Sequence, residues 1–375
     1  METPLRGGSH EGGRARGAND AGMQIRRTLQ TVDCHAAGEP LRIVTGGMPP
    51  LPGETMLARR AYVAEHLDEV RRLLMWEPRG HADMYGCIVT PSVSAGATCG
   101  VLFMHNEGYS TMCGHGIIGL ATALIETGQV ALGRAADAEA GTSASLAFDT
   151  PAGLVQARAE VEGGRVRAVT MRNVASFVFD RRTVAVDGLG DVDTTIAYGG
   201  AFYALVDAGQ AGLGEPPAPA APARAARPPG VLTRLVDAAS AIKAAVLRAG
   251  AIVHPVERGI DGLYGVVAGW PPRRAGADQT SLTVFADREV DRSPCGTCTS
   301  ALMAARWADG RLPVGAAFVN ESPIGTRFTG RLIEEMRVGP YRAVVPEVTG
   351  SASITGFHTF VLDADDPLPE GFLLR

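Results

Sequence analysis

The sequence is poor in lysine: of 35 basic residues, Lys243 is the single lysine and the rest are arginines. An enzyme that uses pyridoxal phosphate holds it as a Schiff base on a lysine. Lys243 lies in an ordinary amphipathic stretch, with no phosphate-binding glycine loop beside it. The scarcity argues against this cofactor, and we expect chemistry that needs no cofactor.

Other features are missing as well. No apolar run is long enough to span a bilayer, and the first residues lack the apolar core of a secretory signal. The net charge of −5 provides no basic surface for nucleic acid. The six cysteines are irregularly spaced in a long chain, which is untypical of a disulfide scaffold. These absences favour a cytoplasmic protein that binds neither a membrane nor nucleic acid.

The length of 375 residues, 46% of them hydrophobic, is enough for two domains with their own cores. Residues 1–23 are rich in Gly, Arg and Ala and predict a disordered tail, with Met23 as an alternative start. The Pro/Ala-rich insert at 209–230 is expected to be an exposed, flexible loop. Elsewhere, many short strand-like stretches and a few helices, including 54–74 and 231–249, predict an α+β fold with sheets round central helices.

Two stretches of the chain repeat one pattern: YSTMCGHGIIGLATALI at 109–125 and DRSPCGTCTSALMAARW at 291–307. In each, Cys-Gly precedes small and apolar residues, which predicts a buried helix that starts directly after Cys113 or Cys295. Free backbone N–H groups and the helix dipole favour a thiolate at such a start. The repeat predicts two halves that face each other, with one thiol each.

Two helix starts that face one cavity would bind a carboxylate through the backbone N–H groups of Gly114, His115, Gly296 and Thr297. The glycine after each cysteine would let a ligand approach the backbone closely. One thiolate would then remove the proton from the carbon next to the carboxylate. The opposite thiol would return a proton to the other face. Together these parts would make a racemase that needs no metal.

These residues resemble the proline racemase family, which includes hydroxyproline 2-epimerases and trans-3-hydroxyproline dehydratases. The resemblance covers nearly the whole chain from about residue 24, in the stretches DCHAAGEPLRIV, EPRGHADMYG, HNEGYSTMCGHGII, DTPAGLV, AYGGAFYALV, DRSPCGT and DPLPEGFLLR. It implies a diaminopimelate-epimerase-like fold of two pseudo-symmetric halves, each with sheets round a central helix and with the active site in the cleft between them. The implied halves are 24–165 plus about 355–375, which carries Cys113, and 166–354, which carries Cys295.

The resemblance also implies roles for the residues around the cysteines. Cys113 and Cys295 would be the acid/base pair, and Asp291 would hold the ring nitrogen. The carboxylate end would be held by Gly114, His115, Gly296 and Thr297. Taken alone, His115 is more often a structural helix-start residue and Asp291 a loop residue, but their positions beside the cysteines favour the functional interpretation. The implied partner is a small-molecule substrate, proline or hydroxyproline, and a homodimer is compatible with the sequence.

One position departs from the family pattern. Cys298 stands three residues after Cys295, where members usually have Gly, and this creates a C-x-x-C motif. A redox or zinc site is the alternative interpretation. Because the sequence has no second C-x-x-C, we expect a small residue that fills the space of a glycine.

Several other residues are expected to be structural. His81 and Asp83 have no evident third ligand, which predicts a turn and not a metal site. The remaining candidates, for which a structural role is expected, are Cys34, Cys87, Cys99, His35, Glu39 and His254.

Two reactions fit these residues. Epimerisation at C2 needs a proton donor on both faces, whereas elimination of water from trans-3-hydroxyproline needs one base at C2 and a leaving hydroxyl at C3. The stretches HNEGYSTMCGH and FADREVDRSP resemble the dehydratases more closely, but dehydratases usually carry Thr or Ser where this chain has Cys295. We therefore predict an epimerase acting at C2 of a hydroxyproline or proline. The alternative is a trans-3-hydroxy-L-proline dehydratase, and a weaker one is a C-x-x-C redox or binding protein.

Overall fold

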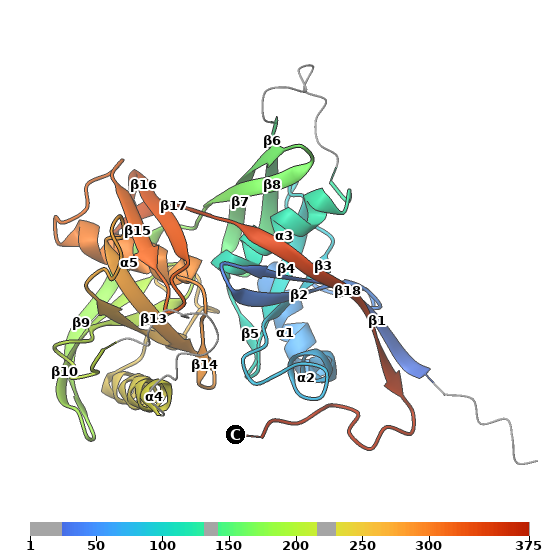
Figure 1. The fold of residues 1–375 in the computed structure, drawn as a ribbon, viewed down its shortest axis with the longest axis horizontal. Coiled ribbons are helices and arrows are strands. Elements are labelled where there is room, and N and C mark those ends of the chain that lie inside the picture. The colour runs from blue at the N-terminus through green and yellow to red at the C-terminus, as the bar shows by residue number, and fades with distance from the viewer. Residues whose placement is uncertain (1–24, 131–141, 216–229, 375) are drawn as a thin grey trace, which may run out of the picture.

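The computed structural model describes residues 25–130, 142–215 and 230–374, and Figure 1 shows them as a ribbon. The predicted tail and most of the predicted insert lie outside the described residues. The helices in this part of the chain are α1 (Met56–His66), α2 (Asp68–Met75), α3 (Gly114–Glu126), α4 (Val231–Ala249) and α5 (Gly296–Ala308). The strands are β1 (Ile25–Ala36), β2 (Glu39–Gly46), β3 (Gly86–Thr90), β4 (Cys99–Met104), β5 (Tyr109–Ser110), β6 (Thr142–Thr150), β7 (Gly153–Glu162), β8 (Arg165–Arg172), β9 (Ser176–Val186), β10 (Gly190–Tyr198), β11 (Phe202–Asp207), β12 (Gly265–Trp270), β13 (Gln279–Phe285), β14 (Glu289–Val290), β15 (Ala317–Glu321), β16 (Arg327–Val338), β17 (Tyr341–Gly350) and β18 (Ala352–Asp363).

One set of strands surrounds α3. β1 pairs with β2 and β18, β2 runs parallel to β3, and β4 runs parallel to β6, which continues into the antiparallel β7 and β8. In β7 the residues alternate between buried Val155, Ala157 and Ala159 and exposed polar neighbours, as in a strand with one face on a core. Because strands lie around α3, its residues from Gly114 to Ile125 are all buried.

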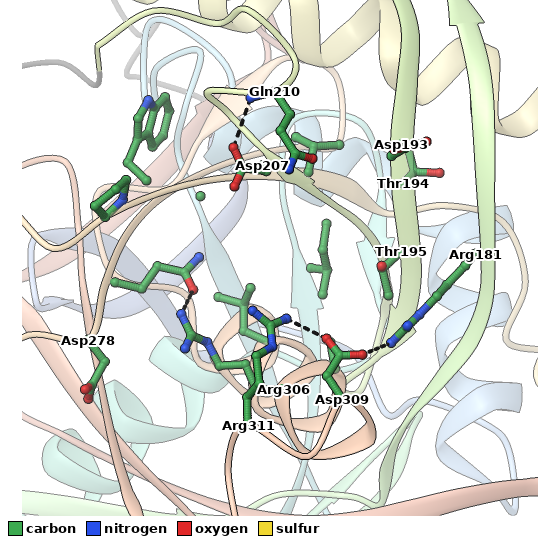
Figure 2. Close-up of a pocket in the computed structure, with 18 of the residues that line it drawn as sticks. Arg181, Asp193, Thr194, Thr195, Asp207, Gln210, Asp278, Arg306, Asp309 and Arg311 are labelled. Atoms are coloured by element: carbon green, nitrogen blue, oxygen red, sulfur yellow. Dashed lines mark hydrogen bonds and ion pairs between the residues drawn. The ribbon is translucent and has the colours of Figure 1, made fainter.

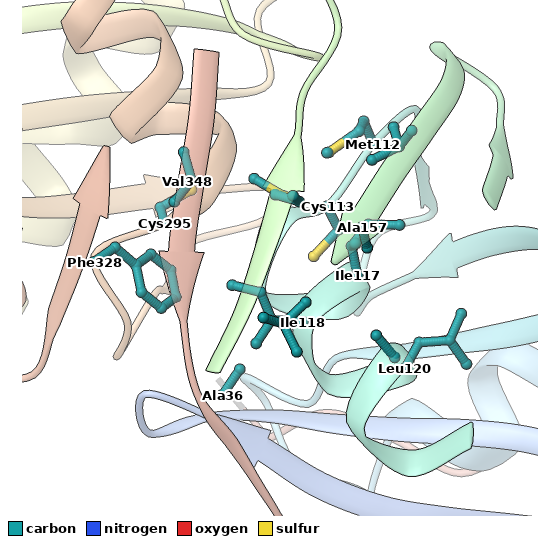
Figure 3. Packing of buried hydrophobic residues seen from close by; sticks show 14 of the residues in the cluster. Ala36, Met112, Cys113, Ile117, Ile118, Leu120, Ala157, Cys295, Phe328 and Val348 are labelled. Atoms are coloured by element: carbon teal, nitrogen blue, oxygen red, sulfur yellow. The ribbon is translucent and has the colours of Figure 1, made fainter. Parts of the chain in front are cut away.

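A second set of strands surrounds α5 and repeats this order of pairing. β10 pairs with β11, β11 runs parallel to β12, and β13 runs parallel to β15, which continues into the antiparallel β16 and β17. The two sets are joined by β17, which pairs with β8 of the first set and with β9 of the second. The largest hydrophobic core extends over both α3 and α5, and Figure 3 shows Cys113 and Cys295 within it.

The helices predicted at 231–249 and after each cysteine are confirmed, but the single helix predicted at 54–74 is wrong. It is divided into α1 and α2 at Leu67, whose backbone angles of φ −135° and ψ 18° leave the helical region. Asp68 and Glu69 then occupy the first turn of α2, where carboxylates are favoured, and Asp68 pairs with Arg71 and Arg72. The apolar spacing continues from α1 into α2 and so predicted one helix, but the polar residues at 68 and 69 start a new one.

Two further results concern secondary structure. β9 and β10 form a hairpin of 11 and 9 residues, longer than the short strand-like stretches that the sequence predicts. Within the described residues, no helix combines the length and apolar character that crossing a bilayer requires.

Candidate active site

Cys113 and Cys295 stand at the N-termini of α3 and α5, as the sequence predicts. Both are N-cap residues, and both are buried. The Sγ of Cys113 accepts a hydrogen bond of 3.2 Å from the backbone N–H of Gly116, which is the usual contact of an N-cap side chain. Each thiol therefore lies at the end of a helix where backbone donors are free.

The two thiols line one closed cavity. Its volume is about 10 Å³, which is room for about one water molecule. The lining residues are Tyr85, Met112, Cys113, Gly114, His115, Tyr203, Tyr264, Phe285, Asp291, Cys295 and Thr297. The structure thus brings together every predicted site residue except Gly296, which adjoins Gly114 at the base of the two helices.

Gly114 and Gly296 are required by the contact between the helices. A Cβ added to Gly114 would lie 2.6 Å from the Cα of Gly296, and one added to Gly296 would lie 2.8 Å from the Cα of Gly114. The terminal methyl group of Met171 packs against the same two glycines and would lie 2.8 Å from a Cβ on either of them. We expected these glycines to leave room for a ligand. In the structure, the space where their side chains would stand is filled by the backbone of the other helix and by Met171.

His115 lies against the first thiol. Its Nδ1 is 3.2 Å from the Sγ of Cys113, and its ring meets the ring of Tyr85 edge-on, with centroids 4.7 Å apart. Burial lowers the pKa of His115 to about 3. The imidazole is therefore neutral at physiological pH and can share a hydrogen bond with the thiol without carrying a charge.

The expected thiolates are not favoured in the closed cavity. Burial raises the pKa of both Cys113 and Cys295 well above the ordinary value. For Cys113, hydrogen bonds from Gly116 and Tyr85 act in the opposite direction but do not outweigh burial. In the closed cavity both sulfurs are thus neutral thiols, because a charged sulfur in so dry a place loses more solvation than the helix end returns. The thiolate that a proton abstraction needs would therefore form while the cavity is open to solvent.

The backbone of Cys295 is unusual. Its φ of 55° and ψ of 108° lie where residues other than glycine are rare, and its side chain makes no capping bond. Cys113, at the matching position, has an ordinary extended backbone with φ −145°. The two helix starts are therefore alike in sequence but different in conformation, and the strained one positions the second thiol.

Asp291 lies beside the second thiol and is 2% exposed. Its Oδ1 accepts hydrogen bonds from the N–H and hydroxyl of Ser293, at 2.8 and 2.7 Å, and the Ser293 hydroxyl in turn accepts from the N–H of Cys295 at 3.0 Å. Burial raises the pKa of Asp291 to about 6, against these hydrogen bonds. The site therefore holds a carboxylate whose charge a bound cation would stabilise.

A second buried carboxylate was missed by the sequence analysis. Glu39 is fully buried, and its Oε2 accepts a 2.6 Å hydrogen bond from the backbone N–H of Arg292, while its Oε1 has no partner among the described residues. Burial and the charge of Asp291 raise the pKa of Glu39 well above its ordinary value. We expected a structural residue near the cleft or the surface; it lies instead next to Asp291, from a strand some 250 residues away.

Aromatic residues are the other part of the site that the sequence analysis missed. The Tyr203 hydroxyl lies 2.6 Å from the Thr297 hydroxyl and 3.7 Å from the Sγ of Cys295. The Tyr85 hydroxyl lies 2.6 Å from that of Ser110 and 3.4 Å from that of Tyr264. Tyr203 and Tyr85 fall in stretches that carry the family resemblance, but nothing in their spacing showed that they converge on the thiols.

Cys298 is buried on the inner side of α5. It is 0% exposed, and its sulfur accepts a 3.4 Å hydrogen bond from the Thr283 hydroxyl. All six cysteines of the chain are free thiols. The C-x-x-C motif is therefore not a disulfide here, and the position agrees with a small residue packed in the core.

The histidines predicted to be structural each accept a hydrogen bond from a backbone N–H two or three residues further along the chain. Asp83 donates its N–H to the Nδ1 of His81 at 3.2 Å, and Gly38 donates to the Nδ1 of His35 at 3.3 Å. The Nδ1 of His254 likewise accepts from the N–H of Glu257. Among the described residues, no three His, Cys, Asp or Glu side chains come together as a metal site.

Two larger cavities lie outside the thiol site. One of about 410 Å³ shares Tyr264 with the thiol cavity and is lined also by Arg60, His105 and Lys243. The other, about 650 Å³ and shown in Figure 2, lies at the far end of α5 and contains none of the predicted site residues. Its wall carries four arginines and four aspartates, so it favours no ligand of one charge.

Comparisons with known proteins agree over the whole described fold. A family model described as proline racemase matches residues 31–373. A trans-3-hydroxy-L-proline dehydratase of Bacillus cereus is 45% identical over 353 residues, 94% of this chain and 100% of that protein. A 3-hydroxyproline 2-epimerase of Burkholderia multivorans is 44% identical over 355 residues, again 94% of this chain and 100% of its own length.

Solved structures give the same result for the fold. A hydroxyproline epimerase from Agrobacterium vitis, crystallised with trans-4-OH-L-proline, superposes with a TM-score of 0.84 at 32% identity, over 94% of this chain and 97% of that one. A PhzF-family phenazine biosynthesis protein of Bacillus anthracis shares the fold alone, with a TM-score of 0.54 at 13% identity, over 89% of this chain and 99% of its own. The diaminopimelate-epimerase-like α+β fold is thereby confirmed.

Proposed function

The chain is an enzyme that belongs to the proline racemase family, and from this premise we propose that it is an epimerase that inverts C2 of a hydroxyproline without a cofactor. One observation carries the proposal: the thiols of Cys113 and Cys295, from two different helix starts, line a single cavity. A carbon held between two thiols can lose a proton to one and receive a proton from the other.

In the proposed reaction, the thiolate of Cys113 removes the C2 proton of the L-isomer, and the C2–H electron pair passes toward the carboxylate. The thiol of Cys295 then delivers its proton to the opposite face, which leaves the protonation states of the two sulfurs exchanged. The charge that develops on the carboxylate would be stabilised by the backbone N–H groups of Gly114, His115, Gly296 and Thr297. The high pKa of each buried thiol favours return of the proton, because the protonated form is the stable one.

Asp291 is the proposed partner of the ring nitrogen. A substrate with a secondary ammonium brings one positive charge into the cavity, and Asp291 is a buried carboxylate beside Cys295. The ammonium would favour the ionised form of Asp291, whose pKa is otherwise raised by burial. Since the cavity holds about one water molecule, its walls must separate before a ring amino acid can enter.

The second candidate function is dehydration of trans-3-hydroxy-L-proline. The relative from Bacillus cereus carries that name, and the chain resembles the dehydratases in the stretches around both cysteines. Dehydration needs the first proton transfer but no acid on the opposite face. The presence of a second thiol at Cys295 favours epimerisation, because an elimination would leave that thiol without a step.

The same proposal includes the division of the chain. The repeated order of strand pairing supports two pseudo-symmetric halves, of which the first is 24–165 plus about 355–375 and the second is 166–354. β8, at Arg165–Arg172, pairs with β7 and packs on α3, which favours a boundary at the end of β8 in place of residue 165. Six free thiols support a cytoplasmic setting.

The test is incubation of the purified enzyme in deuterated water with trans-3-hydroxy-L-proline, trans-4-hydroxy-L-proline or L-proline, followed by proton NMR. We expect loss of the C2 proton signal together with appearance of the C2 epimer. Loss of water without an epimer would favour the dehydratase. Absence of both from all three substrates would reject the proposed function.

A further inference from the structure

The wall of the thiol cavity carries a phenol beside each sulfur. The Tyr203 hydroxyl is 3.7 Å from the Sγ of Cys295, and Tyr85 lines the cavity together with Cys113, its ring edge-on to that of His115. Both tyrosines are buried, and Tyr264, whose hydroxyl lies 3.4 Å from that of Tyr85, is partly buried. A cavity that needed only to enclose an apolar ring would gain nothing from these hydroxyls, because each polar group in a dry site must be satisfied.

The phenols retain hydrogen-bonding capacity. A hydroxyl donates one hydrogen bond and accepts up to two. Tyr85 has one short partner, Ser110 at 2.6 Å, and a longer contact with Tyr264 at 3.4 Å, while Tyr203 has one short partner, Thr297 at 2.6 Å, and a longer contact with Cys295 at 3.7 Å. Burial raises the pKa of both phenols well above the ordinary value, so both remain neutral donors at working pH. Each can therefore bind a substrate hydroxyl in place of its longer contact.

The position of these phenols selects one ring carbon. A thiol that moves the C2 proton must approach C2 to about 3–3.5 Å. A phenol in contact with that sulfur is therefore beside C2, close to the substituents of C3 and one bond further from those of C4. In trans-3-hydroxy-L-proline, moreover, the C3 hydroxyl lies opposite the carboxylate and hence on the same ring face as the C2 hydrogen. The thiol that takes the proton and the phenol beside it face both groups.

We propose that Tyr85 and Tyr203 are specificity-determining residues that bind a hydroxyl on C3, so that the site selects 3-hydroxyproline over 4-hydroxyproline and proline. This inference rests on the proposed function and specifies its substrate. Since Cys113 is the proposed base for the L-isomer, Tyr85 is the phenol that meets the C3 hydroxyl of trans-3-hydroxy-L-proline. Tyr203 would meet a C3 hydroxyl presented on the face of Cys295.

The test compares Tyr85→Phe and Tyr203→Phe with wild type, by C2 exchange in deuterated water. We expect Tyr85→Phe to lower kcat/KM for trans-3-hydroxy-L-proline about 3- to 10-fold relative to L-proline, the effect of one neutral hydrogen bond. Any effect of the lost hydroxyl on the neighbouring Cys113 thiol falls on all three substrates alike, so the readout is the ratio of kcat/KM between trans-3-hydroxy-L-proline and L-proline. Tyr198→Phe, a buried tyrosine in the core around α4, is the matched control and should leave all three unchanged.

The outcomes separate the two proposals. The role of the phenols is overturned if neither variant changes the ratio of kcat/KM between trans-3-hydroxy-L-proline and L-proline. An equal loss with all three substrates has the same meaning, because a hydroxyl that acts only on the thiol or on packing affects every substrate alike. A lowered ratio in Tyr203→Phe alone supports that role and makes Cys295 the base for the L-isomer. Wild-type enzyme that exchanges no substrate rejects the proposed function itself. Melting temperatures of the variants check that the cavity wall is intact.

Discussion

Replacing Gly114 by Ala should disturb both the stability and the chemistry of the protein. The new Cβ would lie 2.6 Å from the Cα of Gly296, whereas ordinary contacts begin at 3.4 Å, so the helix starts must move apart by about 0.8 Å (3.4 − 2.6). The atom in the way belongs to the backbone, and no change of rotamer can relieve the contact. Overpacking of this kind costs about 1–3 kcal/mol of unfolding free energy. A displacement of about 1 Å between the thiols would lower kcat roughly 100-fold.

The assay pairs urea unfolding with C2 exchange in deuterated water. Gly259→Ala is a matched control, since Gly259 is exposed and its nearest neighbour, a methyl group of Leu57, would lie at an ordinary 3.5 Å from the new Cβ. This control should change stability by less than about 0.5 kcal/mol and leave turnover intact. Wild-type stability and turnover in Gly114→Ala would refute the reasoning, because the two helix starts could then separate without consequence.

Four other predictions concern the proposed site. Cys113→Ser and Cys295→Ser should each abolish epimerisation, since a serine hydroxyl is a far poorer base at neutral pH; near-wild-type turnover in either variant would contradict the two-thiol mechanism. Asp291→Asn should weaken binding roughly 10- to 100-fold, the value of a charged hydrogen bond, which titration calorimetry with the ring amino acid would measure. Because burial raises the pKa of Asp291 to about 6 and binding needs its ionised form, the wild-type KM should rise as the pH falls below 6; a flat profile would remove Asp291 from the site. Cys295→Thr should stop formation of the D-isomer but keep exchange of the C2 proton from the L-isomer, and NMR in the presence of reductant would reject this if the D-isomer still forms.

The parts of the site that could be predicted are those recorded in local sequence. Cys-Gly before an apolar run specifies both a buried helix and the residue at its start, so the places of Cys113 and Cys295 on α3 and α5 followed directly. The role of the following glycines did not. What surrounds Gly114 depends on the approach of a helix from nearly 200 residues away, which no local pattern records.

Long-range convergence also explains the residues that were missed. Tyr85 and Tyr203 reach the cavity, and Glu39 reaches Asp291, from three different strands or strand ends. In local sequence, each of the three is indistinguishable from an ordinary buried residue. The protonation of the thiols was mispredicted for a related reason. A helix start is visible in sequence, whereas the degree of burial that raises the pKa of Cys113 depends on the whole assembled core.

The strand shared by the two sets determines how the closed cavity can open. β17 is hydrogen-bonded along one edge to β8 and then to β9, with β16 on its other edge, so separation of the two sets at that edge would break strand ladders. Away from that edge, side chains join the two sets: the Tyr85 and Tyr264 hydroxyls lie 3.4 Å apart, Glu289 accepts a 2.6 Å hydrogen bond from the N–H of Asn106, and Arg292 pairs with Asp83 at 2.8 Å. Contacts of this kind can be exchanged for contacts with water one at a time, whereas a strand ladder is lost as a unit. An opening that spares β17 therefore keeps the two helix starts connected while the cavity widens.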